Sequence, residues 1–227
     1  MNDHVSPVKP GRRTRGFTLV EVMMVVAILG VLIAMTLVAF DAMGRRGALQ
    51  NVAFDLQGVL NTARAQASSR GHSVWVVLYP TASRADRSSA TGQGAFALVE
   101  DPIGRFVSAP ADLFLLPIDK TSTDVSAVYF LEDYSKQVRF AALKPGEKGR
   151  YGPPFATLDV DTCSFCSGAP ARGAIVFNAD GSARFVDGQG VYQGRVNQAL
   201  ALSSVDRTNQ YLFAISGPSA YVATFSP

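Results

Sequence analysis

An uninterrupted apolar run at residues 17–40 constrains this chain more than any other feature of its sequence. The run holds 24 residues and one charged side chain, Glu21. As a helix rising about 1.5 Å per residue it would span about 36 Å, more than the hydrocarbon core of a bilayer, which is about 30 Å thick. The run therefore predicts a transmembrane helix. The basic residues before it predict that residues 1–16 stay in the cytoplasm and that the remainder is exported.

Two other export signals compete with this interpretation. A secretory signal peptide has a shorter apolar segment, about 7–15 residues, followed by a small-residue cleavage site, whereas this run is longer and has only weak candidate sites at its end. The Arg12-Arg13 pair is compatible with a twin-arginine signal, but the apolar run after it is long enough to remain in the membrane. A retained anchor fits the sequence better than either alternative.

Composition and charge exclude several classes of protein. Hydrophobic residues make up 48% of the 227 residues, which suits one globular domain rather than a disordered chain. Four of the 21 basic residues and one of the 18 acidic residues lie in 1–16, which leaves 17 of each in the rest of the chain. A nucleic-acid function based on overall charge therefore loses its support.

Glu21 is an anomaly within the apolar run. A carboxylate held in hydrocarbon costs about 2.5–3.5 kcal/mol on insertion scales, so such a group normally faces a partner or a polar cavity. Its place near the start of the run also allows the side chain to reach the cytoplasmic interface. For the uncut chain alone, that is the simpler explanation.

The residues around Glu21 resemble the processing site of type IV prepilins and type II secretion pseudopilins. A basic leader ends in Gly16, Phe17 follows, and Glu21 stands at the fifth position after the glycine. This resemblance implies that a prepilin peptidase cuts after Gly16 and methylates the new N-terminus at Phe17. It also implies that Glu21 neutralises this amine in a filament. The physics agrees, because a buried carboxylate beside an ammonium group is compensated whereas an isolated carboxylate is not.

A second helix is expected directly after the apolar run. Apolar residues recur at steps of three and four from Leu49 to Ala67, and Arg70-Gly71 supplies a basic last turn and a glycine stop. No proline or polar run intervenes, so we favour one long helix over a separate helix after a linker. Residues 17–40 would then form its membrane half and residues 41–71 its amphipathic half.

The remaining residues, 72–227, predict a β-rich head. Short runs of Val, Ile, Phe and Tyr predict strands at 74–79, 95–99, 128–131, 138–143, 174–177, 183–186, 211–215 and 221–225. The turn residues at 178–181 predict a hairpin over 174–186. Residues 80–94 predict a long loop, and the apolar residues of 102–124 are expected to pack on the head. The expected fold class is α+β, with the long helix packed on an antiparallel, pilin-like head.

The layout also resembles the GspH/FimT class of pseudopilins and minor pilins. An apolar strand that ends at Phe177 and a turn that contains Gly181 reproduce a feature of that class. Some members hold DNA with a Gly-Arg hairpin, but the corresponding turn here is Gly217-Pro218-Ser219-Ala220, and DNA is not expected as a partner. The visible basic candidates for phosphate contact are Arg84, Arg87, Arg172, Arg184 and Arg195, and acidic residues are interspersed among them.

Cys163 and Cys166 form a C-x-x-C pair. In an oxidising compartment, without a second such pair or an exported pair of histidines, the motif favours a structural disulfide over a zinc site. Thiol exchange stays an alternative, since a bond closing so short a loop can be strained. His72 lies in no catalytic motif, and the chain has no P-loop, nucleophile elbow or H-E-x-x-H sequence. We therefore expect no enzyme activity, metal or cofactor.

These observations predict a minor pilin or pseudopilin precursor in the inner membrane, with its head in the periplasm. It would assemble into a type IV pilus or type II secretion filament, periplasmic or extracellular, through its processed helix. The expected partners are other pilin or pseudopilin subunits, prepilin peptidase and the inner membrane. A DNA-capturing or adhesive tip pilin is the competing function, and a membrane-anchored thiol oxidoreductase is the third.

Overall fold

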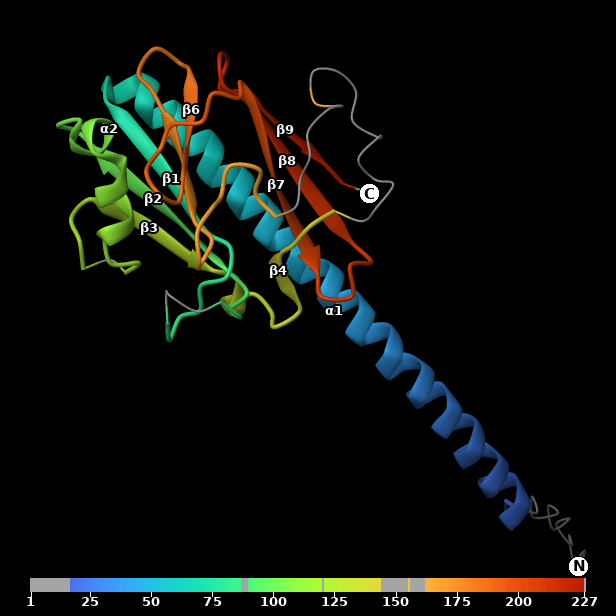
Figure 1. Ribbon diagram of the computed structural model, residues 1–227. Coiled ribbons are helices and arrows are strands. Elements are labelled where there is room, and N and C mark those ends of the chain that lie inside the picture. Colours follow the sequence, from blue (N-terminus) through green and yellow to red (C-terminus); the bar gives the residue numbers. More distant parts are fainter. Residues whose placement is uncertain (1–16, 87–89, 120, 144–154, 156–161, 227) are drawn as a thin grey trace, which may run out of the picture. The chain divides into compact units, whose positions relative to one another are not determined.

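The computed structural model describes residues 17–86, 90–119, 121–143, 155 and 162–226, and its elements are drawn in Figure 1. The helical elements are α1 (Leu19–Arg70), α2 (Arg105–Ser108), η1 (Pro110–Leu115) and η2 (Leu131–Asp133). The strands are β1 (Ser73–Tyr79), β2 (Ala95–Asp101), β3 (Val125–Phe130), β4 (Val138–Phe140), β5 (Gly173–Phe177), β6 (Ala183–Asp187), β7 (Asn197–Ser204), β8 (Gln210–Ser216) and β9 (Val222–Phe225). A long helix followed by antiparallel sheets confirms the predicted α+β class.

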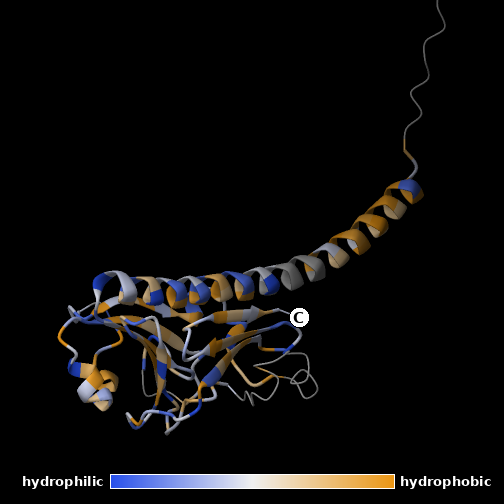
Figure 2. Ribbon diagram, turned by 90° about the horizontal axis from the view of Figure 1, so that it is seen from above, coloured by the Kyte–Doolittle hydropathy of each residue, from blue (hydrophilic) through white to orange (hydrophobic). Residues whose placement is uncertain are grey.

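The chain forms two compact units that meet between Ala42 and Met43. In the first unit, Leu19–Leu37 is a helical segment with a mean hydropathy of 2.6, and none of it is buried. Among the described residues, it is the one helical segment long and apolar enough to cross a membrane. Figure 2 shows hydrophobic residues along almost all of this segment, which therefore needs lipid or other protein around it.

In the second unit, the rest of α1 is amphipathic, as its spacing predicts. The buried residues on this part of the helix recur at steps of one, three and four: Leu49, Val52, Ala53, Leu56, Val59, Leu60, Ala63 and Ala67. The helix ends at Arg70, because Gly71 adopts a positive φ of 71° and its N–H bonds the carbonyl of Ala67 at 3.1 Å. This left-handed residue is a common helix stop that glycine adopts without strain.

Two antiparallel sheets complete the second unit. One has the strand order β3-β2-β1-β5-β6, and the other has the order β4-β7-β8-β9. The predicted hairpin is present, since β5 pairs with β6 and the turn closes through the N–H of Gly181 to the carbonyl of Asn178 at 3.0 Å. Gly181 has a φ of 83°, which explains the glycine at this turn.

The side chains of β1 alternate between two cores. Val74, Val76 and Leu78 pack with α1 and with residues of both sheets, and this cluster contains most of the buried helix face. Trp75 and Val77 point to the opposite face of the sheet, where α2 and η1 cover them. Such strict alternation is the period-two pattern of a strand that is buried on both faces. A third, smaller cluster lies on the other face of the second sheet and includes Leu143 and Phe155.

The structure differs from the sequence prediction at several elements. Strand β7 was not predicted, because its sequence, NQALALSS, lacks the β-branched and aromatic residues that favour strands. It forms nonetheless, since it lies between β4 and β8 and pairs with both. Strand β4 stops at Phe140 rather than at residue 143, and β3 begins at Val125 rather than at residue 128.

The apolar segment at 102–124 packs on the head largely as expected. Phe106, Leu113, Phe114 and Ile118 are buried in the cluster around Trp75. Leu115, which was expected to pack with them, is instead 75% exposed at the end of η1. The short elements α2 and η1 thus form the cover of one sheet face.

Candidate functional site

The predicted processing junction lies at the edge of the described residues. Gly16 and the predicted leader, residues 1–16, fall outside them, and Phe17 is exposed. Thr18 caps α1: its Oγ1 accepts the N–H of Glu21 at 3.3 Å, and its carbonyl accepts the N–H groups of Glu21 and Val22 at 3.1 and 3.2 Å. These bonds satisfy donors that the first turn of a helix otherwise leaves unpaired.

Glu21 lies in the first turn of α1. A helix N-terminus favours a negative charge at this position, because the peptide dipoles place partial positive charge there. The apolar side chains one turn along the same helix face, Met24 and Val25, are exposed. An assembly that covers this face also covers Glu21, and a covered carboxylate requires a partner.

The Cys163 and Cys166 side chains lie at disulfide distance. Their sulfur atoms are 2.12 Å apart and their Cα atoms are 5.2 Å apart. Cys163 belongs to the core cluster beneath α1, and Cys166 packs against the same cluster. Beside them, Phe165 packs against Phe185 of β6, with ring centroids 5.3 Å apart.

Main-chain bonds tie the cysteine pair to β7. Cys163 forms an isolated bridge with Leu200, and the N–H of Ser164 bonds the carbonyl of Ala199 at 2.8 Å. The Ser164 hydroxyl accepts the N–H of Ala199 at 2.8 Å and donates to the Gln198 side chain at 2.5 Å. The pair therefore lies within a packed segment rather than at an open cleft.

The arginines singled out by the sequence do not form one patch. The Arg84 guanidinium pairs with Asp133, and the Arg84 backbone N–H donates to the Glu132 carboxylate at 2.7 Å. Arg172 donates from Nε to the carbonyl of Gly188 at 2.9 Å. Arg87 lies outside the described residues. Separate partners for Arg84 and Arg172 do not build a continuous phosphate-binding surface.

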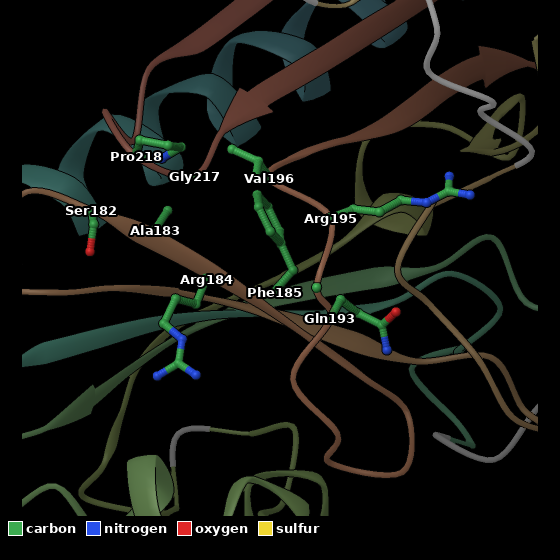
Figure 3. A pocket seen from close by; sticks show the side chains of 10 residues that line it. Ser182, Ala183, Arg184, Phe185, Gln193, Arg195, Val196, Gly217 and Pro218 are labelled. Carbon is green, nitrogen blue, oxygen red and sulfur yellow. The ribbon is translucent and has the colours of Figure 1, made fainter.

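Arg184 and Arg195 line a shared groove of about 240 Å³, shown in Figure 3. Strand β6, the segment before β7 and the turn between β8 and β9 form its walls. Phe185 and Val196 line it between the two arginines, and Gly217 and Pro218 come from the turn. No acidic residue is among the residues that line it.

His72 lies beside a carboxylate rather than in a catalytic arrangement. Its Nε2 is 3.7 Å from the carboxylate of Glu100, which also pairs with Arg70 and accepts a bond from Ser126 at 2.9 Å. Burial alone would raise the pKa of Glu100, but the hydrogen bonds from Ser126 and Arg70 outweigh burial and hold that pKa below its usual value. These contacts join the end of α1 to β2 and β3.

Comparison with known proteins identifies the N-terminal segment. Residues 11–37 match the family model of the prokaryotic N-terminal methylation motif. The chain carries this motif. This motif is that of a type IV pilin leader, and the matched residues include the predicted junction at Phe17, the Thr18 cap and Glu21. No curated protein and no solved structure matches the chain.

Two features of the site were missed in the sequence. The methylation motif contains the pattern Thr18-Leu19-Val20-Glu21, and a threonine three residues before a glutamate is a recognisable capping signal. The groove has no comparable signal, because Arg184, Arg195 and Gly217 come from three separate segments. Only the pairing of the strands brings them together.

Proposed function

We propose that this chain is a minor pilin or pseudopilin, a subunit that enters a type IV pilus or a type II secretion filament through its N-terminal helix. The observation that carries the proposal is the methylation motif at 11–37, which includes the start of α1, where the apolar side chains of Leu19–Leu37 are exposed. Prepilin peptidase would cut after Gly16 and methylate Phe17. The GspH/FimT class is the branch that the β-rich head and the turn at Gly181 favour.

The proposed membrane arrangement follows from charge and hydropathy. The basic leader, residues 1–16, would stay in the cytoplasm, because positive residues are retained on that side. Residues 17–40 would cross the inner membrane, residues 41–71 would continue as the amphipathic helix, and residues 72–227 would form the periplasmic head. After extraction from the membrane, the same apolar helix would pack against other pilin or pseudopilin subunits, in a periplasmic or extracellular filament.

Glu21 is the proposed assembly residue. Processing creates an amine at Phe17, four residues away along the chain, and filament packing would bury both groups among apolar helices. A carboxylate and an ammonium group compensate each other in such surroundings, whereas either one alone is strongly unfavourable. The Thr18 cap supports this role, since it fixes the first turn that carries Glu21.

The two competing functions have less support. A thiol oxidoreductase needs an accessible sulfur, whereas Cys163 is 8% exposed and belongs to the core, and Cys166 is partly buried against the same cluster. A DNA-capturing tip pilin needs a clustered positive surface, whereas Arg84 and Arg172 are engaged elsewhere. A cofactor plays no part in the proposed function.

The Glu21→Val variant tests the assembly role. Removing the carboxylate makes membrane insertion easier, so the variant should accumulate in the membrane and still be cut after Gly16. Without its partner, the buried amine at Phe17 would cost about 3–5 kcal/mol if fully desolvated, so the variant should be depleted from sheared filaments. Asp112→Asn, which removes an exposed head carboxylate, is the matched control. Wild-type incorporation of Glu21→Val would show that the carboxylate merely reaches the interface.

A further inference from the structure

We propose that the groove between Arg184 and Arg195 binds an acidic peptide segment of a partner protein. In this arrangement, an apolar side chain of the peptide contacts Val196 and Pro218, and the carboxylates on either side of it reach the two guanidinium groups. This surface belongs to the head and does not depend on the filament role proposed for the N-terminal helix.

The groove has a defined shape because main-chain bonds close it. Strand β6 is the last strand of its sheet, and the segment before β7 lies along its outer edge through the N–H of Gln193 to the carbonyl of Phe185, at 2.8 Å. Gly217 joins the two sides: its carbonyl accepts the N–H of Ala183 at 2.6 Å, and its N–H bonds the carbonyl of Val196 at 2.7 Å. A Cβ at Gly217 would lie 2.7 Å from that Val196 oxygen, so only glycine permits this approach.

Among the described residues, the two arginines of the groove form no salt bridge, and a carboxylate beside the lining, that of Asp187, accepts a hydrogen bond from Gln193 at 3.0 Å. Elsewhere in the head, Arg70, Arg84 and Arg105 each pair with a carboxylate. Arg184 and Arg195 are both exposed, and neither pairs with an acid among the residues that the structure describes. Two arginines that line one cavity without an acidic partner among the described residues favour an anionic ligand.

Arg184 is held in place by an aromatic ring. Its guanidinium carbon lies 3.8 Å from the centroid of Tyr192, a cation–π contact. The Tyr192 hydroxyl donates to the carbonyl of Val107 at 3.1 Å, which fixes the ring. A stacked guanidinium loses less freedom on binding and keeps its N–H edges open to a carboxylate.

The geometry favours two carboxylates rather than one. Figure 3 shows the Arg184 and Arg195 side chains extending away from each other on either side of Phe185. A single carboxylate would not meet both groups, whereas acidic residues on either side of one apolar residue would. Val196, 56% exposed, offers the apolar contact. Arginine binds each carboxylate with two parallel hydrogen bonds.

The aromatic residues at the groove argue against a nucleic-acid strand. Single-stranded nucleic acids bind basic grooves largely by stacking their bases on open aromatic faces. Phe185 is 1% exposed, and the face of Tyr192 is occupied by Arg184. An acidic peptide needs no such face, so it fits the groove better.

Fluorescence anisotropy on the full chain in detergent tests this inference. The probe is a short labelled peptide with one leucine between two glutamates, and the control peptide has glutamine in place of each glutamate. We expect the acidic peptide to bind, with weaker binding at high salt. The double variant Arg184→Gln, Arg195→Gln should bind about tenfold more weakly or worse, a loss of about 1.4 kcal/mol or more. Arg64→Gln, an exposed arginine on α1, is the matched control and should bind normally.

Three results would overturn the proposal. In the first, the double variant binds the acidic peptide as tightly as the wild type does. In the second, the wild type binds the acidic peptide and the glutamine peptide equally well. The third is tight, arginine-dependent binding of a labelled oligothymidine with none of the peptide, which would assign the groove to nucleic acid. Glu21→Val should bind the peptide as the wild type does, so a failed filament role would leave this measurement unaffected.

Discussion

The hydroxyl of Tyr134 donates a hydrogen bond to the carboxylate of Asp55, and this contact joins the end of η2 to helix α1. The two residues are 79 positions apart in the sequence. Burial, followed by the bond to Asp55 and its negative charge, raises the pKa of Tyr134 well above its usual value. The bond therefore holds α1 against the segment between η2 and β4. Strand β4 is an edge strand of the second sheet.

Tyr134→Phe should lower the free energy of unfolding of the head by about 1 kcal/mol, because it removes one hydrogen bond to a charged group at a half-buried position. Urea unfolding of the full chain in detergent measures this change through the fluorescence of Trp75, the single tryptophan, which is fully buried. Tyr221→Phe, at an exposed tyrosine, should have no effect. Equal effects of the two variants would mean that the bond to Asp55 does not stabilise the head.

Stability should also depend on Glu100 at acidic pH. The pKa of Glu100 is lowered in the folded head, so the unfolded chain takes up this proton at higher pH than the folded chain. The contribution of Glu100 is therefore complete above its ordinary pKa, about 4.3, and is lost as pH falls through the folded value.

The measurement is the urea midpoint from about pH 6 down to about pH 3. Glu100→Gln should flatten this pH dependence, since its amide does not titrate, whereas Asp112→Asn should leave the profile as in the wild type. If the urea midpoint changed with pH equally in the wild type and in Glu100→Gln, the role assigned to Arg70 and Ser126 in lowering the pKa of Glu100 would be contradicted.

Periodicity predicted the helix and much of the sheet structure because burial follows it closely. The steps from Leu49 to Ala67 mark the face of α1 that packs on the head, and Val, Ile and aromatic runs mark β1 and β5. These signals are local, so a sequence displays them directly. The division of the chain into leader, membrane helix and head remains a prediction.

Features that depend on distant partners were not predictable. Strand β7 has weak strand propensity and forms because β4 and β8 flank it. The contact between Tyr134 and Asp55 and the groove at Arg184 likewise depend on which elements pack together. In the candidate site, the motif around Glu21 was visible in the sequence because its residues are adjacent along the chain.

Replacing both cysteines with serine should destabilise the head. We expect no reductase activity in the wild-type protein, so the double variant should lose none. Cys163 is in the core and Cys166 packs against it, with their sulfurs at bonding distance, so serine at 163 would place a hydroxyl group in apolar surroundings. Non-reducing peptide mapping should join Cys163 to Cys166. Robust insulin reduction by the purified protein, lost in the double variant, would instead favour thiol exchange.

The mature N-terminus provides the last prediction. Intact-mass measurement of the native protein should show residues 1–16 missing and one methyl group added at Phe17, because residues 11–37 match the methylation motif. Gly16→Ile should block the cut, since a bulky β-branched side chain at the junction adds volume where the native residue has none. The uncut chain would keep Phe17 in a peptide bond and would present no amine to Glu21, so it should remain in the membrane and stay out of filaments. A mature N-terminus near Asp41 would instead establish ordinary signal-peptide removal, and the apolar helix would then have no part in assembly.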